Sequence, residues 1–192
     1  IWLEARRMIR RSETLRKHAK TKHSIIETPF NDGTFAPLGR DSDTLDGLNV
    51  HGATMDEIHA WKDMNLYDVV ADGTSSRENP LIFIISTAGT VRESVYDRLY
   101  DEGKMVINGY DDENGYKNER MLPIFYELDK RDEWTDPSAW KKANPGLGTI
   151  KQFSALEQSV NRAKANPRLV RNLLTKDFNI PETSSESWLT FE

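Results

Sequence analysis

The sequence has no cysteine and no long apolar run, and each absence excludes a class of protein. Without cysteine, the 192-residue chain can form neither disulfides nor thiolate metal sites. The apolar run at residues 81–85 has the length of a buried strand, whereas a membrane span needs about 20 apolar residues. We therefore expect a globular protein with no membrane partner.

The sequence also lacks a phosphate-binding loop. No G-x-x-x-x-G-K-[ST] pattern occurs, and Gly103-Lys104-Met105 has neither the preceding glycine nor the following hydroxyl. The sequence therefore contains no signature of a loop that cradles phosphates.

Positive charge is too scarce for a protein that coats nucleic acid, because the net charge is -5. Hydrophobic residues make up 37% and charged residues 30%, which is typical of a globular protein with one core. One basic run near the amino terminus can either contact DNA phosphates or form a solvated helix face. It consists of Arg6, Arg7, Arg10, Arg11, Arg16, Lys17, Lys20 and Lys22.

The middle of the chain alternates apolar segments with segments of helical periodicity. A short strand ends at Met55, a helix over residues 57–70 is stopped by Asp72-Gly73, and an amphipathic helix covers residues 91–102. The continuous apolar run at 81–85 indicates a parallel strand buried on both faces, and residues 124–128 a third core strand. This βαβα order predicts a right-handed crossover and a parallel sheet.

The flanking segments differ in character from this sheet. Residues 1–11 have the pattern of a helix, and two short strands at 24–28 and 34–38 enclose an Asn31-Asp32-Gly33 turn, which predicts a hairpin. From Asp136 onward the pattern is helical, with helices expected at residues 136–142, 153–165 and 167–175. We therefore place a subdomain boundary near Asp136.

Two adjacent acids, Asp56 and Glu57, follow the first strand of the βαβα unit. In an ATP-hydrolysing site the first acid helps to hold Mg²⁺, usually through water, and the second orients and polarises the attacking water. The alternative is that Asp56 caps a helix and Glu57 complements its dipole.

The turn Ser86-Thr87-Ala88-Gly89 ends the neighbouring strand. Ligands of open parallel sheets bind at the carboxyl ends of the strands, so the acids and this turn are expected at one edge. Small residues with hydroxyls there can form hydrogen bonds with the γ-phosphate region or its attacking water. They can also transmit the loss of the γ-phosphate to the rest of the protein. The combination favours a nucleotide-hydrolysing site over a plain strand-to-helix turn.

Five segments of the chain together resemble the ATPase domain of tailed-phage terminase large subunits. They are 47–61 (GLNVHGATMDEIHAW), 77–80 (RENP), 85–89 (ISTAG), 142–148 (KANPGLG) and 178–189, which begins FN and ends SWL. The resemblance runs in order from about residue 35 to the end of the chain. Each piece alone is weak, whereas the combination is specific.

This resemblance implies an α/β fold: a P-loop-type (ASCE) ATPase core fragment with a largely parallel sheet, plus a small helical lid and linker. Residues 1–135 would be the C-terminal part of the ATPase core, with the Walker B strand and the coupling motif. Residues 136–192 would be the helical lid subdomain and the linker toward a nuclease domain. The phosphate-binding loop is then expected upstream of Ile1, and the nuclease acids beyond Glu192.

The resemblance also implies roles for individual residues. Asp56 would close the Walker B strand and hold Mg²⁺ through water, and Glu57 would be the catalytic carboxylate. Ser86, Thr87 and Ala88 would bind near the γ-phosphate and couple hydrolysis to movement. The candidate for an arginine that reaches a neighbouring subunit's ATP is Arg40, with Arg77 and Arg92 as alternatives.

The activity implied by the resemblance is that of an ATP- and Mg²⁺-dependent motor that packages double-stranded DNA into a procapsid. Its partners would be DNA, the portal, the small terminase subunit and further copies of itself in a ring. It would work in the host cytoplasm, transiently docked on the procapsid, and carry a separate endonuclease domain.

Three other interpretations remain open at the level of sequence. A superfamily-2-like helicase fragment has similar Asp-Glu-Ile-His and Ser-Thr-Ala motifs, although the segment from Asn144 onward favours terminase. A small metallohydrolase would use His51, Asp56 and His59 as ligands, but their spacing is not a recognised one. A non-catalytic interaction domain would use Asp56 and Glu57 only as a helix start.

The missing phosphate-binding loop leads to a first prediction. The 192-residue chain on its own should bind ATP poorly and cut no DNA, because it lacks the loop and because the resemblance implies that the nuclease acids lie beyond Glu192. Nucleotide binding by calorimetry and magnesium-dependent phosphate release check this expectation. Robust turnover by the purified chain would contradict it.

Overall fold

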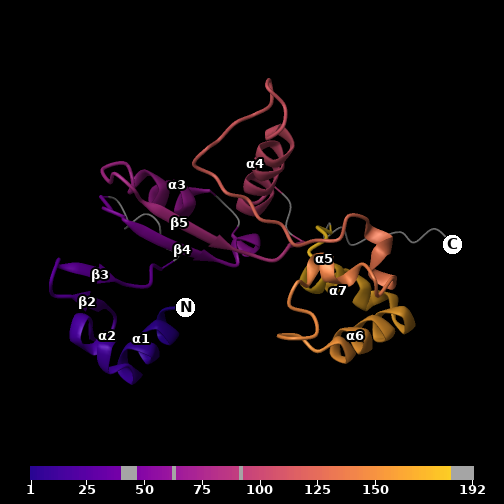
Figure 1. The fold of residues 1–192 in the computed structure, drawn as a ribbon, viewed down its shortest axis with the longest axis horizontal. Helices are drawn as coiled ribbons and strands as arrows, with labels where there is room; N and C mark the ends of the chain where they lie inside the picture. The colour runs from indigo at the N-terminus through magenta and orange to yellow at the C-terminus, as the bar shows by residue number, and fades with distance from the viewer. Residues whose placement is uncertain (40–46, 62–63, 91–92, 183–192) are drawn as a thin grey trace. The chain divides into compact units, whose positions relative to one another are not determined.

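The computed structural model describes residues 1–39, 47–61, 64–90 and 93–182. The chain divides into two compact units, Ile1–Asp46 and Gly47–Glu192 (Figure 1). Among the described residues, no helix combines the length and the apolar character that crossing a bilayer requires.

The first unit is a pair of helices followed by a small antiparallel sheet. Its elements are α1 (Trp2–Arg11), α2 (Glu13–His18), β1 (Lys20–Thr21), β2 (Ile26–Thr28) and β3 (Gly33–Phe35), with strand order β1-β2-β3. The Ser12 side chain accepts a hydrogen bond from the Leu15 N–H and so caps α2. Asp32 adopts a left-handed φ of 52° in the turn between β2 and β3, which confirms the predicted hairpin.

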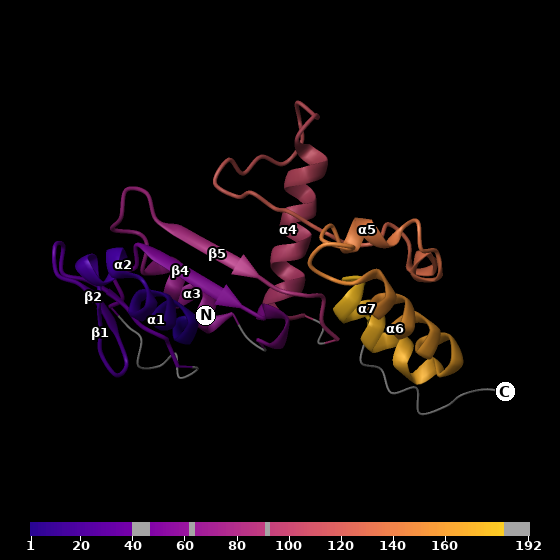
Figure 2. The same cartoon turned by 60° about the horizontal axis from the view of Figure 1, so that its bottom comes forward.

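The second unit begins with two parallel strands, drawn side by side in Figure 2. These are β4 (Gly52–Asp56) and β5 (Leu81–Ile85), joined through the short 3₁₀ helix η2 (Ile58–Ala60) and α3 (Asn65–Asp72). The helix α4 (Val95–Gly109) follows β5, and the Ser94 and Asp97 side chains form a capping box at its start. The βαβα order and the parallel pairing confirm the predicted α/β fold class.

One face of this sheet is covered and the other is exposed. The hydrophobic core on the covered face consists of Met55, Ile58, Val70, Val95 and Leu99, and Ala53, Ile82 and Ile84 pack against it. On the other face, Leu81, Phe83 and Ile85 are 65%, 56% and 47% exposed. The prediction that β5 is buried on both faces is therefore wrong for the described structure, because helices cover only one side.

The single helix predicted over residues 57–70 is also wrong. Glu57 has a left-handed φ of 53°, and its N–H donates to the carbonyl oxygen of Ile85 at 2.9 Å, so it extends the sheet. A short 3₁₀ turn follows, and the regular helix begins only at Asn65. The helix does end where the sequence predicts, at Asp72 with Gly73 as its C-cap.

The predicted third core strand at 124–128 is extended but belongs to no β-ladder among the described residues. The segment packs on α4: the Tyr100 and Phe125 rings lie 4.8 Å apart, and the Tyr100 hydroxyl donates to Glu127 at 2.7 Å. Burial, followed by this hydrogen bond, raises the pKa of Tyr100. A strand needs a partner for its backbone groups, and side-chain packing on a helix does not supply one.

The rest of the second unit is helical. It contains η3 (Arg131–Thr135), α5 (Trp140–Ala143), α6 (Phe153–Ala165), η4 (Pro167–Leu169) and α7 (Val170–Asp177). Their shared core, which we call the helical cluster, is built from Leu128, Ala139, Trp140, Ala143, Leu147, Leu156, Val160, Ala163, Leu173 and Phe178. The second unit thus has two hydrophobic cores. The residues of the first core extend to Leu99, and those of the second begin at Leu128. The subdomain boundary at Asp136 stays a prediction.

Phe178 provides a test of the helical cluster, because its side chain is fully buried and its ring lies 6.2 Å from the Trp140 ring. Phe178→Ala should lower the free energy of unfolding by about 3–5 kcal/mol, since it leaves a cavity. Urea denaturation followed by tryptophan fluorescence measures the loss. Phe30→Ala is the matched control: that ring is 72% exposed, and its removal should change stability by less than about 0.5 kcal/mol.

Candidate nucleotide-hydrolysis site

The two predicted acids lie where parallel strands end. Asp56 is the last residue of β4, its side chain is exposed, and it pairs in register with Ile85, the last residue of β5. Glu57 follows directly, and its side chain is 59% exposed. Both carboxylates are therefore open to solvent at the carboxyl edge of the sheet, where open α/β sheets bind ligands.

The backbone of Glu57 is held in a conformation that non-glycine residues rarely adopt. Its φ is 53° and its ψ is 44°, and such strain costs on the order of 1–3 kcal/mol. Glu57 occupies the N-cap position of η2, yet its own side chain makes no capping hydrogen bond. The geometry thus argues against acids that merely begin a helix, because the strained Glu57 gains no capping hydrogen bond through its carboxylate.

The Ser86 turn lies beside the acids, as expected from the sequence, and His59 connects the two. The Ser86 hydroxyl donates to the Thr87 carbonyl at 2.9 Å and accepts from the His59 backbone N–H at 3.1 Å. The ring Nδ1 of His59 lies 3.1 Å from Ser86 Oγ and 3.0 Å from Glu57 Oε2. Because the Ser86 hydrogen is directed at Thr87, we assign the proton to Nδ1, which donates to both neighbours.

His59 is the site residue whose contacts the sequence did not reveal. Its position two residues after Glu57 was visible, but its partner Ser86 is 27 residues away. The turn after Ser86 is also packed tightly against His59: a Cβ added at Gly89 would lie 2.8 Å from the His59 Cβ. Glycine at position 89 therefore permits the close approach of the turn to His59.

The remaining turn residues are more enclosed than the acids. Thr87 is half-buried, and Ala88 is 2% exposed. The Ala88 N–H donates to the side-chain oxygen of Asn179 at 3.4 Å. The turn thus contacts Glu57 through His59 on one side and the end of α7 on the other.

Arg40, the candidate trans-acting arginine, lies outside the described residues, as does Arg92. Arg77 is described: it is exposed, and its guanidinium lies 3.5 Å from the Asn49 carbonyl oxygen. It follows α3 and precedes β5, so it lies near the amino end of that strand, away from the acids. This placement gives Arg77 no contact with the acids of its own chain.

The residues at the acid pair fit a magnesium site completed by phosphate oxygens. Mg²⁺ is commonly held by one or two carboxylates together with substrate phosphates and water, and Asp56 supplies one exposed carboxylate. Within the described ranges, no group of three or more His, Asp or Glu side chains could hold a metal ion. The alternative site of His51, Asp56 and His59 is therefore not formed there.

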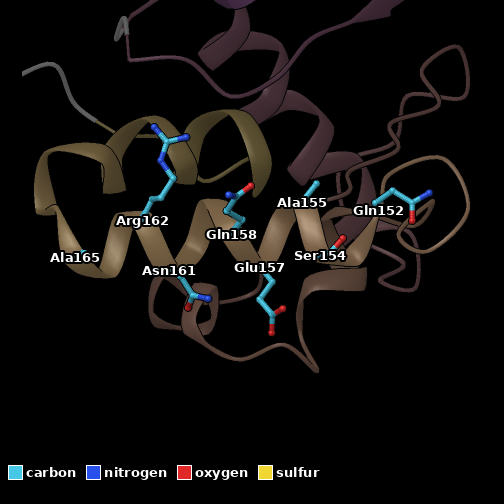
Figure 3. A pocket seen from close by; sticks show the side chains of 8 residues that line it. All are labelled: Gln152, Ser154, Ala155, Glu157, Gln158, Asn161, Arg162 and Ala165. Carbon is cyan, nitrogen blue, oxygen red and sulfur yellow. The ribbon is translucent and has the colours of Figure 1, made fainter.

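An open hollow also runs along α6, and its lining side chains do not converge. Figure 3 shows Gln158 and Arg162 directed to one side of the helix, and Glu157 and Asn161 to the other. A binding pocket needs polar groups directed at a common point. This hollow is therefore the exposed surface of one helix and not a second candidate site.

Comparison with known protein families identifies two matching family models. "Terminase large subunit, ATPase domain" matches residues 2–105, and "Terminase large subunit, endonuclease domain" matches residues 118–192. The first range includes both acids and the Ser86 turn. The second includes the helical cluster.

Two individual relatives also match the chain. "Protein YmfN" of Escherichia coli (strain K12) is 35% identical over 136 residues, which is 70% of this chain and 29% of the relative. "Terminase large subunit" of Lactococcus phage p2 is 22% identical over 193 positions, covering 97% of this chain and 34% of the relative. The chain thus spans about a third of the length of these relatives.

The fold is also similar to a solved structure. "Crystal structure of the HK97 bacteriophage large terminase" matches with a TM-score of 0.77 and 19% identity, covering 92% of this chain and 36% of that one. At this identity the match establishes similarity of fold. It supports the α/β core and the helices that follow it.

The close contact between the turn and His59 can be tested at Gly89. Gly89→Ala should lower the free energy of unfolding by about 1–3 kcal/mol, because the new methyl group must displace His59 or the turn. Urea denaturation gives the change, and the His59 ring resonances should shift. Gly52→Ala is the matched control, since its Cβ would meet nothing nearer than the Leu81 carbonyl oxygen at 3.9 Å. Equal stability of the two variants would contradict the packing argument.

Proposed function

Because the chain belongs to the terminase large subunit family, we propose that it supplies the hydrolytic edge of an ATP-driven motor that packages phage DNA. The observation that carries the proposal is the contact of His59 with both Glu57 and Ser86. It connects a carboxylate suited to activating water with a turn suited to sensing a γ-phosphate. A non-catalytic interaction domain has no need of this arrangement.

We assign the chemical roles as follows. Glu57 accepts a hydrogen bond from the attacking water and polarises it, and His59 fixes the position of its carboxylate. Ser86, Thr87 and Ala88 lie beside the γ-phosphate and respond to its loss. Asp56 would hold Mg²⁺ through water, and the ion would supply positive charge to the transferred phosphoryl group.

The helical cluster falls within the range of the endonuclease-domain model, but three acids beside it are engaged in ion pairs. Asp129 and Glu133 pair with Lys142 at 2.6 and 2.7 Å, and Asp177 pairs with Lys151 at 2.6 Å. Carboxylates engaged in this way do not form a metal-binding group. We therefore propose that residues 136–192 act as lid and linker and that nuclease chemistry uses acids outside the described residues.

The partners proposed for the whole protein follow from its family. They are double-stranded DNA, the portal, the small terminase subunit and further copies of the chain in a ring, with the host cytoplasm and the procapsid as its place of action. We propose Arg40 as the arginine that reaches a neighbouring subunit's ATP. The family matches favour the terminase over the superfamily-2-like helicase that the sequence motifs left open.

Glu57→Gln tests the proposed function in the product of the complete reading frame that encodes this chain. The amide cannot act as a base, so ATP turnover should fall by about 10²–10⁴-fold while nucleotide affinity is kept. Phosphate release and calorimetric binding measure the two quantities. Glu78→Gln, at an exposed glutamate just before β5, is the matched control and should retain full turnover. Retained turnover in Glu57→Gln would exclude this role for Glu57.

A further inference from the structure

Asn179 joins the turn at the candidate site to two other segments. Its side-chain oxygen accepts the Ala88 N–H at 3.4 Å, and its side-chain nitrogen donates to the Tyr126 carbonyl at 2.7 Å. Ala88 lies 91 residues away in the sequence and Tyr126 lies 53 residues away. One amide therefore bridges the end of α7, the turn after β5 and the extended segment beside α4.

The backbone around Asn179 is fixed to the helical cluster on both sides. The Phe178 carbonyl accepts the Leu128 N–H at 3.3 Å, and the Ile180 N–H donates to the Leu174 carbonyl at 2.9 Å. The Phe178 side chain is fully buried in that cluster. Asn179 itself has a φ of 54°, a left-handed conformation that asparagine tolerates better than most residues. Its position is thus set by the helical cluster and not by the turn.

The two hydrogen bonds of the Asn179 amide differ in strength. A distance of 2.7 Å is that of a firm hydrogen bond, whereas 3.4 Å is near the limit at which such a bond still contributes. A small displacement of the turn therefore breaks the bond to Ala88 first and leaves Asn179 on the Tyr126 side.

We propose that Asn179 is the positioning residue that transmits the nucleotide state of the Ser86 turn to the helical cluster. This inference rests on the proposed function, because the turn must respond to the γ-phosphate. When the turn moves, the Ala88 N–H gains or loses its acceptor, and the end of α7 and residues 121–128 respond together. A hydrogen-bonded connection of this kind carries coupling when its two ends have discrete arrangements.

Hydrogen–deuterium exchange tests the proposal in the product of the complete reading frame. Exchange is compared with and without Mg²⁺ and a non-hydrolysable ATP analogue in three segments: 84–90, 121–128 and 170–182. In the unmodified protein the analogue should change exchange in all three. In Asn179→Gly, which keeps the left-handed backbone available, the change at 170–182 should fall by about fivefold or more while that at 84–90 persists.

Two further variants separate transmission from simple stability. Asn179→Asp keeps an acceptor for Ala88 but places a carboxylate oxygen against the Tyr126 carbonyl, so it should lose the response at 121–128. Asn166→Ala is the matched control: Asn166 caps η4 in the same helical cluster through the Arg168 N–H. Asn166→Ala should raise basal exchange in the helical cluster without altering the response to nucleotide. If Asn179 had a merely structural role, Asn179→Gly would give this same result.

The outcomes distinguish this inference from the proposed function. Absence of ATP turnover in the unmodified protein overturns the proposed function. Normal turnover together with an unchanged nucleotide response at 170–182 in Asn179→Gly overturns the role of Asn179 alone. An unchanged response at 121–128 in Asn179→Asp likewise overturns the role of Asn179 and leaves the proposed function standing. Turnover that persists while the response at 170–182 disappears supports both.

Discussion

The in-register parallel pairing of β4 with β5 is the constraint on which the rest of the site depends. It sets Asp56 opposite Ile85, so both strands end at the same level. The Glu57 N–H continues the pairing through the Ile85 carbonyl, and this hydrogen bond holds Glu57 in its left-handed conformation. A one-residue shift of either strand would exchange its buried and exposed faces and separate the acids from the Ser86 turn.

The elements that depend on local sequence were predictable. The hairpin around Asp32 follows from a turn chemistry that tolerates positive φ, and α6 follows from its periodicity between residues 153 and 165. The parallel order of β4 and β5 follows from the helical segment between them. In each case the residues that decide the structure lie within one element or its immediate connection.

The predictions that failed concern segments whose structure depends on partners far away in the sequence. The backbone of Glu57 is decided by Ile85, a residue 28 positions later, and therefore a helix-like pattern from residue 57 did not produce a helix there. The burial of β5 depends on what lies over its second face, which its own apolar run does not specify. Residues 124–128 have a strand-like composition but are packed on Tyr100 of α4 instead of a neighbouring strand. Long-range partners override local preference in all three.

The candidate site shows the same division. Residue types placed Asp56, Glu57 and Ser86 at one edge, and the structure places them there. Their connection through His59, and the bridge from Ala88 to Asn179, depend on contacts across 27 and 91 residues that no local pattern encodes.

The location of these connections follows from the geometry of a parallel sheet. Beyond the last paired residue, backbone N–H and C=O groups no longer have strand partners and must find others. Here Glu57 continues the ladder, whereas the Ala88 N–H uses the side chain of Asn179, which follows Phe178 of the helical cluster. The strand ends that offer a site for a phosphate therefore also offer the unpaired groups through which a distant segment can be connected. The candidate catalytic edge and the proposed link through Asn179 therefore lie at the same end of the sheet, where strand pairing stops.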